Sequence, residues 1–169
     1  MKIEDDSIIL RPAVAEDNAF LLQVYQSTRG DDLRGLGWDE ERINEFLSMQ
    51  YQAQQKFFQT DYQQAADEII MYDGECAGRL IVERRDHEVR FIDLALLPRY
   101  QNRGVGSFLI RQLQNQSRAE GKPLRLQVIR FNRAVHLLER LGFERTSETG
   151  THFQMEWTPR VRSPGDSEG

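Results

Sequence analysis

The residues best suited to chemistry lie between a hydrophobic run and an amphipathic stretch, in the segment Gln101-Asn102-Arg103-Gly104-Val105-Gly106-Ser107. The two glycines have no Cβ, so a ligand can approach the backbone closely at these points. The N–H groups of a first helical turn attract anions, and the arginine adds charge and paired hydrogen-bond donors. The segment therefore predicts a cradle for a pyrophosphate group.

The spacing argues against two other phosphate-binding motifs. A dinucleotide-binding fingerprint has a third glycine three residues after the second and follows the first strand of its domain. Position 109 is a leucine instead, and the segment lies late in the chain. A P-loop requires Gly-Lys followed by Ser or Thr, a run that the sequence lacks. A glycine-rich turn between a strand and a helix, without any ligand, is the structural alternative.

Hydrophobic patterning predicts the two elements that position this segment. Before it, Glu88 to Leu97 is apolar on both faces from Phe91 onward, so we expect a central, buried strand that Pro98 ends. After it, an amphipathic pattern predicts a helix from Gly104 to Glu120. The segment therefore connects the end of a buried strand with the start of a helix.

The rest of the chain predicts one α/β domain. Its other elements are a strand at 7–11, a helix at 17–28, a glycine-rich loop at 29–37, a helix from Asp39, strands at 68–72 and 76–84 joined by Asp73-Gly74, a strand at 124–128, a short helix at 134–141 and strands at 143–146 and 151–157. Together they give a mixed, largely antiparallel sheet of about seven strands with about four helices. We assign residues 1–157 to this domain and residues 158–169 to a disordered tail.

The composition is that of a globular protein, with 169 residues, 39% hydrophobic and 29% charged. No apolar run approaches the ~20 residues of a membrane span, and the acidic start lacks the apolar stretch of a secretory signal. The single cysteine, Cys76, fits a reducing compartment. We therefore expect a cytoplasmic protein without a membrane partner. Its three scattered histidines have no metal-ligand spacing.

The net charge of −5 is unevenly distributed. Residues 1–93 carry a net charge of −10, whereas residues 94–157 carry +5. A basic half suits an anionic cofactor and an acidic half suits a cationic acceptor, although an ordinary solvated surface explains the same asymmetry. Nucleic acid is not an expected partner, because the sequence has no basic cluster with interleaved aromatic residues.

Candidate acceptor-binding residues lie in and before the helix that begins near Asp39. Two glutamines, Gln50 and Gln54, interrupt its apolar stripe, and they face either a polar cleft or the edge of the stripe. Trp38 and Tyr51 are aromatic candidates for the same site, with core packing as the alternative for each. These residues predict that this helix contributes to an acceptor site.

Two segments together resemble the GNAT superfamily of N-acetyltransferases. Gln101–Gly106 is similar to the Gln/Arg-x-x-Gly-x-Gly/Ala motif of that family. The later segment Asn132–Phe143 is similar to its Asn-x-x-Ala-x-x-Tyr-x-x-x-Gly-Phe segment. Leu10–Ala13 and Glu16-Asp17 resemble the usual first strand and helix entry. The order and spacing of these segments match over about Ile8 to Trp157.

The resemblance implies an acyl-CoA site with acetyl-CoA as co-substrate and no metal. The residues that it assigns to the cofactor are Leu94, Ala95, Leu96, Gln101, Asn102, Arg103, Gly104, Val105, Gly106, Ser107 and Asn132. The first three would pair through their backbone with the pantetheine arm, and the last would lie near the thioester. The amides from Arg103 to Ser107 would hold the pyrophosphate. The implied sheet splays at the central strand, with the cofactor in the gap.

Two residues that the family uses for catalysis are replaced in this chain. A tyrosine that protonates the leaving thiolate often stands where this chain has Leu138, and a glutamate base of some members stands at Gln127. Asp93 on the central strand is the candidate base, with a buried structural carboxylate as the alternative. Tyr100 is the candidate acid, with water as the alternative.

The favoured function is therefore transfer of an acetyl group from acetyl-CoA to a primary amine of a small molecule or peptide. The alternative is a weakly active or silent acyl-CoA-binding regulatory module, which the two replacements favour. A dinucleotide-binding protein is disfavoured by the position of the glycine motif. The identity of the acceptor, the acyl chain length and the oligomeric state do not follow from the sequence.

Overall fold

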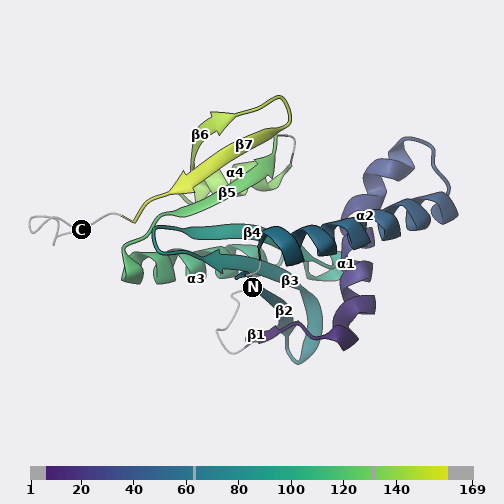
Figure 1. The fold of residues 1–169 in the computed structure, drawn as a ribbon, viewed down its shortest axis with the longest axis horizontal. Coiled ribbons are helices and arrows are strands. Elements are labelled where there is room, and N and C mark those ends of the chain that lie inside the picture. The colour runs from purple at the N-terminus through teal and green to yellow at the C-terminus, as the bar shows by residue number, and fades with distance from the viewer. Residues whose placement is uncertain (1–6, 63, 131, 160–169) are drawn as a thin grey trace, which may run out of the picture. The chain divides into compact units, whose positions relative to one another are not determined.

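The computed structural model describes residues 7–62, 64–130 and 132–159 (Figure 1). Its elements are β1 (Ile8–Pro12), η2 (Ala15–Asp17), α1 (Asn18–Gly35), α2 (Glu40–Asp61), β2 (Ala66–Tyr72), β3 (Glu75–Arg84), β4 (Val89–Leu96), η3 (Pro98–Tyr100), α3 (Val105–Glu120), β5 (Leu124–Ile129), α4 (Ala134–Arg140), β6 (Glu144–Glu148) and β7 (His152–Trp157), where η marks a 3-10 helix. The strands form one sheet in the order β1-β2-β3-β4-β5-β7-β6. The β4–β5 pair is parallel, and the β1–β2, β2–β3, β5–β7 and β6–β7 pairs are antiparallel, which confirms the predicted mixed sheet.

The chain packs as two compact units that share β4. The first unit consists of the chain up to Glu83 together with Ile92–Gly106. The second consists of Arg84–Phe91 and the chain from Ser107 onward. The end of β4 and the glycine-rich loop that follows it therefore belong to the first unit.

In the first unit, α1 and α2 pack on each other and on β2. The antiparallel β2–β3 pair turns at Asp73 and Gly74, whose φ angles of 48° and 83° suit the tight hairpin that the sequence predicts. The buried core cluster comes from both helices and from β2, and its members are Leu21, Tyr25, Ile43, Leu47, Tyr51 and Ile69. This core holds the two helices on the strands that lead into the loop.

Helix α1 is longer than the sequence predicts. The expected loop at 29–37 is wrong, because the helix continues to Gly35 and ends before Gly37, where φ is 84°. Leu33 packs against the core cluster, and Arg34 pairs with Asp31 in the same helix and with Glu40 at the start of α2. Packing and these ion pairs offset the low helix propensity of the glycines, about 1 kcal/mol each.

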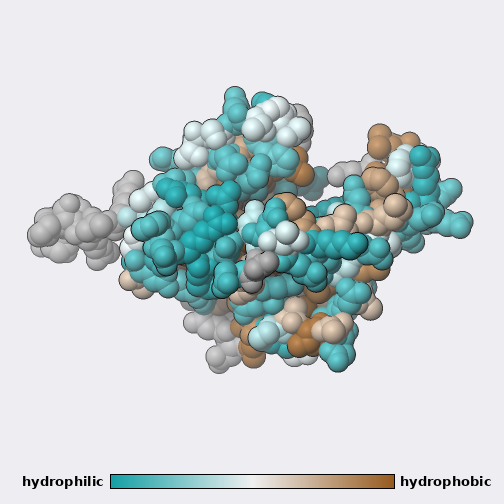
Figure 2. All heavy atoms as spheres, viewed as in Figure 1, coloured by the Kyte–Doolittle hydropathy of each residue, from teal (hydrophilic) through white to brown (hydrophobic). Residues whose placement is uncertain are grey.

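Helix α2 begins where the sequence predicts. Asp39 is its N-cap, and the Asp39 carboxylate accepts a hydrogen bond of 2.8 Å from the Arg42 amide. Its buried face consists of Ile43, Leu47 and Tyr51, spaced by one helical turn. Figure 2 shows hydrophobic residues gathered where α1 leads into α2, and the exposed members of this region are Leu36, Phe46 and Met49.

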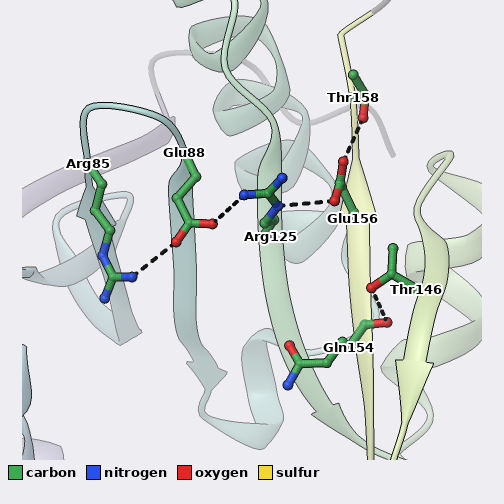
Figure 3. Close-up of polar contacts among 7 residues, drawn as sticks. All are labelled: Arg85, Glu88, Arg125, Thr146, Gln154, Glu156 and Thr158. Carbon is green, nitrogen blue, oxygen red and sulfur yellow. Dashed lines mark hydrogen bonds and ion pairs between the residues drawn. The ribbon is translucent and has the colours of Figure 1, made fainter.

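The second unit contains β5, β7, β6 and α4, together with α3 from Ser107 onward. Helix α3 buries Leu109 and Leu113 in this unit, whereas Phe108 is half-buried. A row of ion pairs crosses the strands in Figure 3, where Glu88 accepts from Arg85 and Arg125, and Arg125 also donates to Glu156. Burial acts to raise the pKa of Glu88, but the neighbouring arginines outweigh it and lower that pKa. The row ties the start of β4 to β5 and β7.

Strand β4 is central in the strand order, as predicted, but it is less buried than expected. Arg90 to Leu94 are half-buried, whereas Val89 and Ala95 are buried. The parallel register with β5 comprises three pairs and ends at Phe91 with Leu126, although β4 itself continues to Leu96. The disorder predicted for the tail concerns residues 160–169, which lie outside the described residues.

Candidate functional site

The glycine-rich loop follows β4 directly and is held by hydrogen bonds to the end of that strand. The Gln101 side chain donates to the Leu96 carbonyl at 2.9 Å, and the Tyr100 amide donates to the Leu97 carbonyl at 2.9 Å. Asn102 and Gly104 adopt left-handed backbone angles, with φ of 60° and 83°. These turns bring the chain to the first residue of α3 within a few positions.

The loop meets the physical requirements of an anion cradle. Gln101, Asn102, Arg103 and Gly104 are exposed, and α3 has no acidic residue in its first turn. A Cβ on Gly106 would touch only the Leu94 side chain, at 3.7 Å, so the glycine keeps this part of the helix start open. The start of α3 is therefore accessible, and Arg103 is an exposed cationic residue two positions before it.

The strand segment that the resemblance assigns to the pantetheine arm lies beyond the β4–β5 register. Leu94, Ala95 and Leu96 belong to the first unit, and Leu97 donates its amide to the Ala77 carbonyl of β3 at 2.9 Å. A Cβ on Gly78 would collide with the Ala95 carbonyl oxygen, so a glycine is required for this close approach of β3 and β4. The end of β4 is thereby fixed from the β3 side.

Asp93 is the carboxylate closest in sequence to this segment, and it is half-buried. Desolvation raises the pKa of the Asp93 carboxyl, and the charges of Arg29 and Arg79 together with the Leu94 amide act against this rise. A carboxyl with a raised pKa accepts a proton more readily than an exposed carboxyl does.

Helices α1 and α2 place a polar cluster on the same unit as Asp93. The Tyr25 hydroxyl donates to Gln50 Oε1 at 3.5 Å, and the Arg29 guanidinium lies 4.0 Å from the centre of the Tyr25 ring. Burial raises the pKa of Tyr25, and the Asp93 charge raises it further while Arg29 lowers it. Gln54 Oε1 is buried without a hydrogen-bond partner among the described residues. Gln50 therefore lies beside Tyr25, whose pKa the charge of Asp93 affects.

The other predicted acceptor residues have structural roles. Tyr51 is 2% exposed, and its hydroxyl donates to Asn18 Oδ1 at 2.9 Å. Trp38 packs edge-on against Phe46 and carries the Arg42 guanidinium on its ring, at 3.8 Å. Core packing, the alternative given for both aromatic residues, is what the structure shows for Tyr51 and, in large part, for Trp38.

Tyr100 and Leu138 are both buried. The Tyr100 hydroxyl donates to Glu75 Oε2 at 2.8 Å, and burial together with this carboxylate raises its pKa. Leu138, at the position where the family often has a tyrosine, is 3% exposed in the core of the second unit.

Asn132 accepts a hydrogen bond from the Ala134 amide at 2.9 Å, at the start of α4.

Sequence reasoning missed the arginines that surround Asp93. Arg29 was assigned to a loop, although it lies in α1, and Arg79 was treated as part of an ordinary strand. Arg79 is 4% exposed and donates to both oxygens of Asp67. A single arginine in the apolar run Cys76–Val82 was the available signal, because a buried arginine requires a partner.

Comparisons with known proteins agree with this geometry. The family model described as "Acetyltransferase (GNAT) family" matches residues 31–143, more than half of the chain. No curated protein sequence matches the chain significantly. No helix in the described part of the chain has the length and apolar character needed to cross a membrane.

Several solved structures share the fold. PaiA N-acetyltransferase from Thermoplasma acidophilum, in complex with coenzyme A, has a TM-score of 0.70 and 20% identity, over 90% of this chain and 99% of that one. An acetyltransferase from Thermus thermophilus has a TM-score of 0.65 and 17% identity, over 90% and 97% of the two chains. The ribosomal-protein-S18-alanine N-acetyltransferase from Escherichia coli has a TM-score of 0.62 and 17% identity, over 94% and 97%.

These structures show the fold, and the family model shows the relationship in sequence. The mixed sheet of seven strands with four α-helices in the described part of the chain matches the fold of these structures. The chain belongs to the GNAT acetyltransferase family.

Proposed function

We propose that this protein transfers an acetyl group from acetyl-CoA to a primary amine of a small molecule or peptide, with Asp93 as the base. The observation that carries the proposal is the position of Asp93. It is half-buried, its pKa is raised by desolvation, and it immediately precedes the strand segment and loop that are suited to hold the cofactor.

The cofactor would be held by the loop and the end of β4. The amides from Arg103 to Ser107 and the positive end of α3 would bind its pyrophosphate, with Gln101 and Asn102 shaping the turn. The backbone of Leu94–Leu96 would pair with the pantetheine arm, and Asn132 would lie near the thioester. When bound, acetyl-CoA supplies an activated acetyl group.

The chain's own residues would prepare the amine. An amine with its proton removed is the nucleophile, and a carboxylate with a raised pKa accepts that proton more readily than an exposed one. Arg29 and Arg79 oppose the rise in the pKa of Asp93, because their positive charges favour the ionised carboxylate. Gln50 and Gln54 would offer amide oxygens to the remaining N–H groups.

Protonation of the leaving group is a smaller requirement. A thiol has a reference pKa of roughly 8.5, so a thiolate leaves near neutral pH with little help. Tyr100, the candidate acid, donates a hydrogen bond from its hydroxyl to Glu75, and its raised pKa makes it a weaker acid than an exposed tyrosine. Water is the simpler proton source.

A thiol-release assay with a panel of amines tests the proposal. We expect release of CoA that depends on both acetyl-CoA and a primary amine, and mass spectrometry should find the amine heavier by one acetyl group. CoA binding by calorimetry without turnover on any amine would favour the regulatory module instead. The buried Leu138, which leaves the family's usual acid absent, is the observation that keeps this second function in view.

A further inference from the structure

A pocket with a volume of about 340 Å³ lies beside the second half of α2, within the first unit. Its walls come from the last turns of α2, from the segment that follows the helix, and from β2 and β3. Its principal residues are Gln55, Phe58, Tyr62, Asp67, Arg79 and Ile81. The sequence motifs do not assign any function to this pocket.

An ion pair between Arg79 and Asp67 lines the pocket. The arginine is buried, whereas the aspartate carboxylate is partly exposed. Arg79 donates Nε and Nη2 to the two oxygens of Asp67, at 2.9 and 2.8 Å, and Nη2 also donates to Gln55 at 2.8 Å. The Arg79 side chain is 5% exposed, whereas that of Asp67 is 33% exposed. A ligand in the pocket therefore meets mainly the more exposed Asp67 carboxylate, because the Arg79 guanidinium already has acidic and amide partners and also lies 5.8 Å from the centre of the Phe58 ring.

The end of α2 adds further negative potential. The helix has 22 residues, ends at Asp61 and has no basic residue in its last turn. The carbonyl groups at a helix C-terminus carry a partial negative charge, which cationic side chains often compensate. Lys56 is exposed one turn earlier and does not line the pocket. The helix end therefore favours a cation from outside the chain.

Aromatic rings complete the lining. The rings of Phe58 and Tyr62 are 5.9 Å apart in an edge-on arrangement, and both residues line the pocket. Aromatic faces attract ammonium and guanidinium groups, more strongly where water is partly excluded. An accessible carboxylate beside two aromatic rings is the chemistry that recognises an organic cation.

The pocket is also connected to the proposed base. Arg79 and Ile81 lie on β3, the strand next to β4, which carries Asp93. The charges of Arg79 and Asp67 both act on the pKa of Asp93, in opposite directions. Pocket and base are therefore within electrostatic range of one another in the same unit.

We propose that the pocket formed by Phe58, Tyr62, Asp67 and Arg79 binds a second cationic group of the acceptor, so that the acceptor carries one amine to be acetylated and another positive charge at a distance. This inference rests on the proposed acetyl transfer. A free diamine and a peptide amine followed by a basic side chain share this chemistry.

Matched substrates test the proposal. Each of a series of α,ω-diamines is compared with the 1-aminoalkane of the same length, and a peptide with lysine in its second position is compared with the alanine peptide. Either the diamines or the lysine peptide should be preferred over the matched substrate that lacks the second positive charge. We expect the ratio of the two kcat/KM values to be at least about tenfold, the factor that corresponds to 1.4 kcal/mol. Preference for the diamines identifies a free diamine, and preference for the lysine peptide identifies a peptide.

Phe58→Leu should reduce this ratio toward one while leaving the monoamine unchanged. Phe57→Leu is the control, because Phe57 is the preceding residue of the same helix, is 51% exposed and does not line the pocket, so this variant reports what the loss of its ring contacts with Phe58 and Tyr62 does by itself. Equal kcat/KM values within both substrate pairs, or a ratio that Phe58→Leu leaves intact in a folded protein, would overturn the inference.

Binding without turnover separates this inference from the proposed function. Calorimetry should show that a diamine binds the wild-type protein more tightly than the diol of the same length, and that Phe58→Leu removes the difference. If this holds but no amine is acetylated, the proposed function fails and the cation site stands. If amines are acetylated and diamine and diol bind equally, the cation site fails alone.

Discussion

The Tyr100 hydroxyl donates a hydrogen bond of 2.8 Å to Glu75 Oε2 and so ties the residue before the glycine-rich loop to the first residue of β3. Tyr100 is 5% exposed, and its ring lies 5.6 Å from that of Tyr72. The Arg99 guanidinium also approaches Glu75, at 3.4 Å. Tyr100 is thus an anchor for the start of the loop.

Removal of this hydroxyl should affect the loop more than the chemistry. We expect Tyr100→Phe to cost about 1 kcal/mol of stability, the usual net value of one hydrogen bond, and to weaken CoA binding slightly with kcat retained. Glu75→Gln should act in the same direction, because it removes the charge from the same contact. Urea unfolding, calorimetry and steady-state kinetics check both variants. A loss of kcat of about 10²-fold with unchanged CoA affinity would make Tyr100 the general acid after all.

Gly104→Asp should abolish tight CoA binding. The substitution places a side chain where φ is 83° and a negative charge where the diphosphate is expected, so we predict at least about a tenfold loss of affinity by calorimetry. Gly121→Asp is a matched control, because Gly121 also has a positive φ, of 68°, and has open space around it at the other end of α3. Equal CoA affinity of the two folded variants would show that the loop is not the pyrophosphate site.

Asp93→Asn should lower kcat by about 10²–10⁴-fold while CoA affinity is retained, since general base catalysis typically contributes that factor. The base must be ionised, so the wild-type rate should fall as the pH drops through the raised pKa of Asp93. This acidic limb should be missing from the residual rate of Asp93→Asn. A pH–rate profile from pH 6 to 9 checks the prediction, and full activity of the variant would assign Asp93 a structural role and leave water as the base.

The ion pair of Asp17 with Arg11 should stabilise the first unit in a pH-dependent manner. Both Asp17 oxygens accept from Arg11 at 2.8 Å, and this pairing together with the Val14 amide lowers the pKa of Asp17 to about 2. Because the pKa of Asp17 is lower in the folded chain than in the unfolded chain, its charged form stabilises the fold at pH values above the unfolded pKa, near 3.9. That stability is lost as the pH falls toward 2. Arg11 is 36% exposed, so solvent screening reduces the effect.

We therefore expect Asp17→Asn to lose about 1 kcal/mol of unfolding free energy at pH 7. The difference from the wild type should shrink as the pH is lowered from about 4 to 2, where the wild-type carboxylate also becomes protonated. Urea unfolding at a series of pH values measures this difference. A constant difference over the whole range would mean that the substitution acts through packing and not through the charge.

Features that depend on neighbouring residues could be predicted from the sequence. Asp39 begins α2, Asp73-Gly74 turns the hairpin, and the glycine-rich loop leads into α3, because backbone angles and helix ends are set by a few adjacent residues. The family resemblance depends on the same local segments. The succession of helices and strands along the chain, and the mixed sheet, followed from these elements and that resemblance together.

Contacts between distant residues were decided by the tertiary structure. Ile69 pairs with Arg79 in the β2–β3 register, so Asp67, two residues away on the same face, lies diagonal to the arginine and can bind it. Helix α1 continues past Arg29 because Leu33 finds a place against the core, and Leu138 lies buried although its motif resembles one with a tyrosine. The sequence determined the glycine-rich loop, whose geometry is local, whereas strand register and helix packing determined which charges act on the pKa of Asp93.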